Sequence, residues 1–144
     1  MDPTARLDGL RSLLDAPGPA VLVTYRRDGS AAVSPVWFRY TGEAFEVVVA
    51  KGDAKLQHLA RDPRATLMIF ESVAPFRGVK VQADAELVDD GSGIDEARRS
   101  ISVRSLGPET AAAFVAQRGE GVIVRLPSSA AKAWDLSKIL PATL

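Results

Sequence analysis

Cysteine is absent from this sequence of 144 residues, and histidine occurs only once, as His58. The missing thiols exclude disulfides, thiolate metal sites and a cysteine nucleophile, and they fit a reducing compartment. A single imidazole also excludes a metal site built from several histidines. No hydrophobic run approaches the roughly 20 apolar residues that span a bilayer, and residues 1–10 lack the basic flank and apolar stretch of a secretory signal. We therefore expect a cytoplasmic protein with no membrane partner.

An excess of charge of either sign is also absent. Eighteen lysines and arginines balance eighteen aspartates and glutamates, so the formal net charge is zero. Without a global field, the protein is not drawn to nucleic acid, and any anion site must be built locally. Hydrophobic residues make up 47% of the chain, which is enough for one core at this length. We predict a single domain over residues 1–144.

The order of sequence patterns predicts a mostly antiparallel protein. A short helix begins at Asp2-Pro3 and ends before Pro17, and Asp28-Gly29 and Thr41-Gly42-Glu43 mark two hairpin turns. Strands are expected at residues 20–25, 31–40, 44–50, 65–72, 78–88, 121–126 and 130–136, and further helices at 53–62, 91–107 and 108–119. Hairpins and short connections disfavour a parallel Rossmann sheet and favour a small barrel with helices at its edges.

Apolar periodicity indicates which faces are buried. The leucines of the first helix fall on one face; they are Leu7, Leu10, Leu13 and Leu14. Alternating apolar residues between 78 and 88 predict a half-buried strand; they are Val79, Val81, Ala83, Ala85 and Leu87. Both faces should therefore contribute to one core.

The turn after the strand 44–50 is the main local candidate for a binding site. Free N–H groups at a helix start, together with the ammonium groups of Lys51 and Lys55, could hold a phosphate. Alternatively, Asp53 is simply the helix N-cap, with its carboxylate accepting from the N–H of Leu56 and both lysines in water. Local sequence favours the N-cap and leaves the phosphate site open.

Other chemical groups give weaker indications. His58 would be needed for a Ser-His-Asp triad, but it lies in the middle of a predicted helix and no G-x-S-x-G motif accompanies it. The acidic pairs 89–90 and 95–96 are expected in loops and at helix starts. Trp37 and Trp134 could cover a planar ligand or a neighbouring subunit, although their spacing alone favours core packing.

Several stretches, in this order, resemble the pyridoxamine 5'-phosphate oxidase-like split β-barrel superfamily of flavin-binding proteins. They are AVLVTYRRDGSAAVSPVWFRY (20–40), the spaced K-x-x-x-L-x-x-D-P-R-x-x-L (55–67) and FRGVKVQADAEL (76–87). The ending W-D-x-x-K (134–138) is similar to that of the actinobacterial branch, which uses the deazaflavin coenzyme F420. The resemblance implies a mainly β fold, namely a six-stranded antiparallel split β-barrel with peripheral helices, and a homodimer with two cofactors at the subunit interface.

The resemblance also implies where the cofactor lies. Its ring system would lie beside the second and third strands and its phosphate at the strand-to-helix turn, while Phe76-Arg77 and Trp134-Asp135 would cover it, the latter pair from the other subunit. Many relatives carry arginine or a small hydroxyl residue where Asp53 stands, and commonly asparagine where His58 stands. The implied cofactor-binding residues are Ser34, Pro35, Val36, Trp37, Lys51, Gly52, Asp53, Lys55, His58, Arg77, Trp134 and Asp135.

The implied activity is that of an F420-dependent oxidoreductase, a reductase that transfers a hydride between the bound cofactor and a small conjugated organic substrate. The alternatives are an FMN-binding relative of pyridoxamine 5'-phosphate oxidase and a non-enzymatic split barrel that binds or stores a cofactor, which Asp53 favours. No catalytic residue is identified. The proton could come from solvent, Tyr25, Arg77 or His58, and the helical insertion 92–118 is given no role.

Overall fold

Short strands and a few helices make up the fold. The computed structural model describes residues 7, 9–91 and 93–141. The strands are β1 (Ala20–Tyr25), β2 (Ala31–Val36), β3 (Arg39–Tyr40), β4 (Ala44–Ala50), β5 (Arg64–Phe70), β6 (Gly78–Asp84), β7 (Glu86–Val88), β8 (Gly121–Pro127) and β9 (Ala131–Trp134). The helices are α2 (Arg11–Asp15), α3 (Ala54–Arg61), α4 (Ile94–Leu106), α5 (Pro108–Ala116) and the 3-10 helix η1 (Ser128–Ala130). In this part of the chain the helices and strands follow the predicted order, except that two predicted strands are each divided into two.

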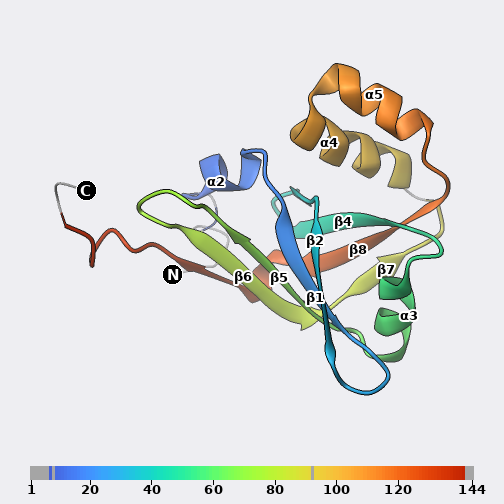
Figure 1. The fold of residues 1–144 in the computed structure, drawn as a ribbon, viewed down its shortest axis with the longest axis horizontal. Coiled ribbons are helices and arrows are strands. Elements are labelled where there is room, and N and C mark those ends of the chain that lie inside the picture. The colour runs from blue at the N-terminus through green and yellow to red at the C-terminus, as the bar shows by residue number, and fades with distance from the viewer. Residues whose placement is uncertain (1–6, 8, 92, 142–144) are drawn as a thin grey trace.

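Two antiparallel sheets enclose the core. One sheet has the strand order β2-β1-β5-β6-β9 and the other the order β3-β4-β8-β7 (Figure 1). Every pairing between the described strands is antiparallel. The core cluster takes side chains from both sheets, such as Leu22 and Leu67 from the first and Phe45 and Val124 from the second. The mainly β, antiparallel architecture predicted from the hairpins is therefore confirmed.

The number and arrangement of the strands differ from the expected six-stranded barrel. The described residues form nine strands in two sheets that do not close into one barrel. The chain also changes sheet at two places where a single strand was predicted. The strand expected over 31–40 divides at residues 37–38, where Phe38 is fully buried. The strand expected over 78–88 divides at Ala85, whose N–H donates to the carbonyl of Pro63 at 2.8 Å.

The predicted apolar faces are largely confirmed. All four leucines expected on the first helix are buried in the core, although α2 itself spans only Arg11–Asp15. The proposed helix start at Asp2-Pro3 lies outside the described residues. In the 78–88 stretch, Val79 and Val81 are fully buried, and the three following alternate residues, Ala83, Ala85 and Leu87, are partly buried against the same core.

Arg104 holds the segment that follows α2 against α4. Its guanidinium donates to the carbonyls of Leu14 and Gly18 at 3.1 Å each and also to the carbonyl of Ala16. The guanidinium carbon lies 4.0 Å from the ring centre of Phe38. Burial lowers the pKa of Arg104, and the three carbonyls accept hydrogen bonds from the buried guanidinium. Through these bonds one side chain caps the end of α2, where the last carbonyls of a helix have no partner within the helix.

Glu46 forms a buried ion-pair network across three strands. The residue is 3% exposed and lies directly opposite Arg39 on β3 and Arg125 on β8. Its carboxylate accepts from Arg39 at 2.8 Å and from Arg125 at 2.7 Å. Opposite charges in directly facing positions stabilise an antiparallel pair, so this network fixes the register of the four-stranded sheet.

The helices α4 and α5 pack against each other, and α4 contacts the strands β3, β4 and β8 (Figure 1). Gly107, with a φ of 79°, ends α4, and Pro108 begins α5, as expected for a glycine stop followed by a proline at a helix start. In the part of the chain that the structure describes, no helix is long and apolar enough to cross a membrane.

Candidate functional site

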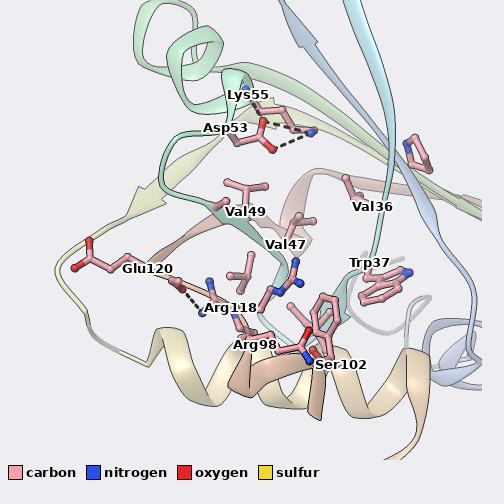
Figure 2. A pocket seen from close by; sticks show the side chains of 17 residues that line it. Val36, Trp37, Val47, Val49, Asp53, Lys55, Arg98, Ser102, Arg118 and Glu120 are labelled. Atoms are coloured by element: carbon pink, nitrogen blue, oxygen red, sulfur yellow. Dashed lines mark hydrogen bonds and ion pairs between the residues drawn. The ribbon is translucent and has the colours of Figure 1, made fainter. Parts of the chain in front are cut away.

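A groove of about 510 Å³ lies where the end of β2, the strand β4 and the helices α4 and α5 meet. Residues 47–50 of β4 provide an apolar wall, with Val47 and Val49 themselves buried in the core. Figure 2 shows Asp53 and Lys55 at one side of this wall and Arg98, Ser102 and the two helices at the other. Apolar walls with a few convergent polar groups are typical of small-molecule sites.

Trp37 lines the groove because the chain turns from one sheet into the other at this point. Phe38 is directed into the core, so its neighbour Trp37 is directed outwards and remains 36% exposed. The Trp37 ring centre lies 5.3 Å from that of Phe114 on α5, with the rings tilted by 56°. The Arg118 guanidinium carbon lies 4.4 Å from the ring centre of Phe114. This side of the groove is therefore aromatic with a cation above it.

The start of α3 provides the other polar side of the groove. Asp53 is the N-cap, as predicted, but its carboxylate accepts from the N–H of Lys55 at 2.8 Å, whereas the N–H of Leu56 donates to the backbone carbonyl of Asp53. The predicted capping partner was therefore wrong by one residue. The Lys55 ammonium is not in open water, because it lies 3.3 Å from the Asp53 carboxylate and its side chain is only 19% exposed.

Five of the residues predicted to bind a cofactor line this groove together: Pro35, Val36, Trp37, Asp53 and Lys55. Lys51 does not, because its ammonium pairs with Glu120 at 2.9 Å and lies on the surface. The hydrogen bond to Glu120 raises the pKa of Lys51. Gly52 and Ser34 also lie outside the groove lining.

His58 is held inside the fold by Thr24. Its Nδ1 lies 2.9 Å from the hydroxyl of Thr24, a residue on β1 that is 1% exposed. The imidazole thus connects α3 to the five-stranded sheet and does not line the groove.

The remaining predicted residues lie at the far end of the five-stranded sheet. Arg77 is bound to Glu71 at 2.7 Å, Trp134 faces Gly78 across β6 and β9, and Asp135 accepts from the backbone and hydroxyl of Ser137. The Ser137 hydroxyl lowers the pKa of Asp135. None of these predicted residues lines the groove in this chain.

The sequence analysis missed the groove residues that lie in or just after α4 and α5, among them Arg98, Ser102, Phe114, Gln117 and Arg118. All come from α4, α5 and the residues just after α5. One signal was present, because Arg98 lies four residues after the buried Ile94 and three before the buried Ile101. A charged residue on the buried face of a helix indicates a specific partner or site.

Comparisons with known proteins place the chain in a family. A profile of the pyridoxamine 5'-phosphate oxidase family matches residues 7–128, so the chain belongs to this family. A solved structure described as an F420 reductase is 26% identical, with a TM-score of 0.67, and the match covers 85% of this chain and 94% of that chain. Among curated protein sequences, no match was found.

Two further solved structures share the fold. A conserved hypothetical protein from Mycobacterium tuberculosis is 23% identical, with a TM-score of 0.78 and coverage of 93% of this chain and 88% of that chain. The heme storage protein HutZ from Vibrio cholerae is 17% identical, with a TM-score of 0.65 and coverage of 94% and 95%. The fold alone therefore occurs in proteins with different ligands.

Proposed function

We propose that this protein binds a flavin-type cofactor in the Trp37 groove and acts as a reductase, with F420 preferred over FMN. The observation that carries this proposal is the groove itself, which joins the aromatic Trp37 to the cation Lys55 along an apolar wall. Family membership supports a flavin-type cofactor, and the likeness to an F420 reductase, together with the W-D-x-x-K ending, supports the deazaflavin.

The groove residues fit the ring system of such a cofactor, and one groove cation is placed to hold its phosphate. Valines and Trp37 supply apolar area for a planar ring. Lys55 is the cation placed to hold the phosphate, but Asp53 already neutralises it at 3.3 Å. A phosphate must therefore compete with a carboxylate for one ammonium group.

When bound, a reduced cofactor of this class supplies a hydride, and the chain positions the reactants. Trp37 and Phe114 would orient a flat molecule against the surface of the ring pair, and α5 would shield that side of the groove from water. The Glu120 carboxyl lines the groove, but its hydrogen bond with Lys51 lowers its pKa, so it is ionised near neutral pH and does not donate a proton. The proton that completes the reduction is therefore assigned to solvent.

A second copy of the chain would complete the site. The outer face of the five-stranded sheet carries an apolar surface that includes Val33 on β2, 64% exposed, and Phe70 on β5, 50% exposed. Val33 and Pro35 share one face of β2, so this surface continues into the groove. We therefore include a homodimer in the proposal, with Trp134 and Asp135 of a second copy reaching the cofactor. Val33→Glu should then give a monomer in light scattering.

Fluorescence titration of the purified protein with F420 and FMN, each separately, tests cofactor binding. Lys55→Ala should weaken binding by about 1.5–3 kcal/mol, as for a charge-assisted hydrogen bond. Lys51→Ala is the matched control and should change the affinity little, because Lys51 is exposed and paired with Glu120. If neither cofactor binds, the reductase proposal fails. If Lys51→Ala weakens cofactor binding and Lys55→Ala does not, the phosphate lies at Lys51 and not in the groove.

A second candidate is a non-enzymatic split barrel that binds or stores a ligand. The Asp53–Lys55 ion pair favours it, because it occupies the cation that a phosphate would need. Turnover assays separate the two candidates: cofactor binding without reduction of any conjugated acceptor would select the binder.

A further inference from the structure

Arg98 is a buried cation with no carboxylate partner among the described residues. The residue is 9% exposed, and its Nη1 donates a 2.7 Å hydrogen bond to the carbonyl of Gly119. A guanidinium has five N–H donors, and buried charges are normally paired. Because Arg98 lines the groove, it has donors left for an anion that enters there.

The absence of a side chain at Gly121 leaves the space that the Arg98 guanidinium occupies. A Cβ added at Gly121 would lie 2.2 Å from Arg98 Nη2 and 3.1 Å from its Cζ. The guanidinium therefore lies directly against the backbone of β8 and is held there by the Gly119 carbonyl. A cation fixed in this way needs little reordering to bind a ligand.

Arg118 adds a second cation on the same side of the groove. It is exposed, has no carboxylate partner among the described residues, and stacks on Phe114, which contacts Trp37. The other charges that line the groove are paired: Lys55 with Asp53, and Glu120 with Lys51. The unneutralised positive charge of the groove thus lies at its α4–α5 side, next to the aromatic pair (Figure 2).

We infer that the groove binds a planar, conjugated compound that carries an oxyanion, namely a carboxylate, with the flat body against Trp37 and Phe114 and the carboxylate between Arg98 and Arg118. This inference rests on the proposed function, because it names the substrate class of the same site. Guanidinium groups match the planar geometry of a carboxylate, and stacked aromatic side chains accept a flat body.

The two arginines would also favour the reduction. Charge neutralisation draws electron density from a double bond conjugated with the carboxylate, which makes its far carbon a better hydride acceptor. That carbon takes the hydride from the reduced cofactor, the π electrons move to the carbon next to the carboxylate, and this carbon takes a proton from solvent. The substrate gains two electrons and the cofactor loses two.

Fluorine NMR of the cofactor-free protein tests the binding directly, with 4-fluorocinnamate as the acid and 4-fluorocinnamamide as its neutral analogue. We expect the acid to bind at least tenfold more tightly than the amide. Arg98→Met, which keeps the apolar stem, should reduce the affinity for the acid at least tenfold. Arg98→Lys, which keeps a positive charge, should reduce it less. Arg99→Gln, an exposed neighbour on α4 outside the groove, is the control and should have no effect.

Arg118→Gln should weaken the binding of 4-fluorocinnamate by only about threefold, since this arginine is exposed. This variant keeps the test valid if Arg98→Met does not fold. Equal binding of acid and amide would overturn the inference. Tighter binding of 4-fluorophenyl phosphate than of the cinnamate would overturn its assignment to a carboxylate.

Cofactor titrations separate this inference from the proposed function. If Arg98→Met weakens F420 or FMN binding and leaves the cinnamate unchanged, the guanidinium belongs to the cofactor and the inference is wrong. If neither cofactor binds while cinnamate binding still depends on Arg98, the acid site stands and the reductase proposal fails.

Discussion

The indole of Trp134 covers the backbone of Gly78, its direct neighbour across β6 and β9. A Cβ added to Gly78 would lie 2.0 Å from Cζ2 of that indole. An aromatic side chain packed over a cross-strand glycine compensates for the missing side chain of the glycine. The position of Trp134 therefore depends on a residue 56 places away in the sequence having no side chain.

Gly78→Ala should displace the Trp134 indole and reduce the free energy of unfolding by about 1–3 kcal/mol, the usual cost of overpacking. Urea unfolding measures the loss, and in a Trp37→Phe background the emission of Trp134 should shift to longer wavelength. Gly52→Ala serves as the control, because nothing lies within 4 Å of its added Cβ. Equal stability of the two glycine variants would contradict the packing described here.

Asp53→Ser should increase the affinity for a phosphate-bearing cofactor by up to about fivefold, because it releases Lys55 from an ion pair of about 0.2–1 kcal/mol. Serine is also a good N-cap, so the free energy of unfolding should change by less than about 0.5 kcal/mol. Asp53→Asn, which also removes the carboxylate charge and keeps a good N-cap residue, should increase the affinity in the same way. Weaker binding by the serine variant would mean that Asp53 itself contacts the ligand.

Glu46→Gln should reduce the free energy of unfolding by about 3 kcal/mol, since it leaves Arg39 and Arg125 without their buried carboxylate. Chemical denaturation measures this change. Glu86→Gln removes a carboxylate that is 66% exposed and 3.4 Å from Arg125, and it should cost less than about 1 kcal/mol. A similar loss of unfolding free energy in both variants would show that the burial of Glu46 does not increase its contribution to stability.

The Glu71–Arg77 pair should make stability depend on acidic pH. The Arg77 hydrogen bond lowers the pKa of Glu71 below its ordinary value of 4.5, so the pair stabilises the fold above that value and its contribution is lost as the pH falls through the lowered pKa. The stability difference between the unmodified protein and Glu71→Gln should therefore be largest above pH 5 and shrink in acid. A stability difference that does not vary with pH would contradict this coupling.

Local patterns predicted most of the strands and helices. The Asp28-Gly29 turn and the alternation of Val79 and Val81 define their strands within a few residues, because hairpin turns and burial act over short distances. The change of sheet at residues 37–38 was not predictable from period two, since burial of Phe38 depends on packing between the two sheets. An apolar residue in a strand gives no sign of which sheet will cover it.

The candidate site was predicted only in part for the same reason. Trp37 and Lys55 came from the family pattern, and the structure brings both to one groove. Arg98 and Arg118 come from a helical insertion that the pattern does not include, and the Lys51–Glu120 pair joins residues 69 positions apart. Which partner a surface lysine selects depends on the folded geometry and not on its neighbours in the sequence.

The Arg104 side chain gives the segment before β1 a structural role beyond covering the core. It fastens residues 14–18 through three carbonyls and lies on Phe38, the residue next to Trp37 in the chain. A protease cut or deletion within Ala16–Pro19 would uncover this cation and loosen the bend that directs Trp37 into the groove. Trimming the chain at this loop would thus impair ligand capture at a distance, with every residue of the groove still present.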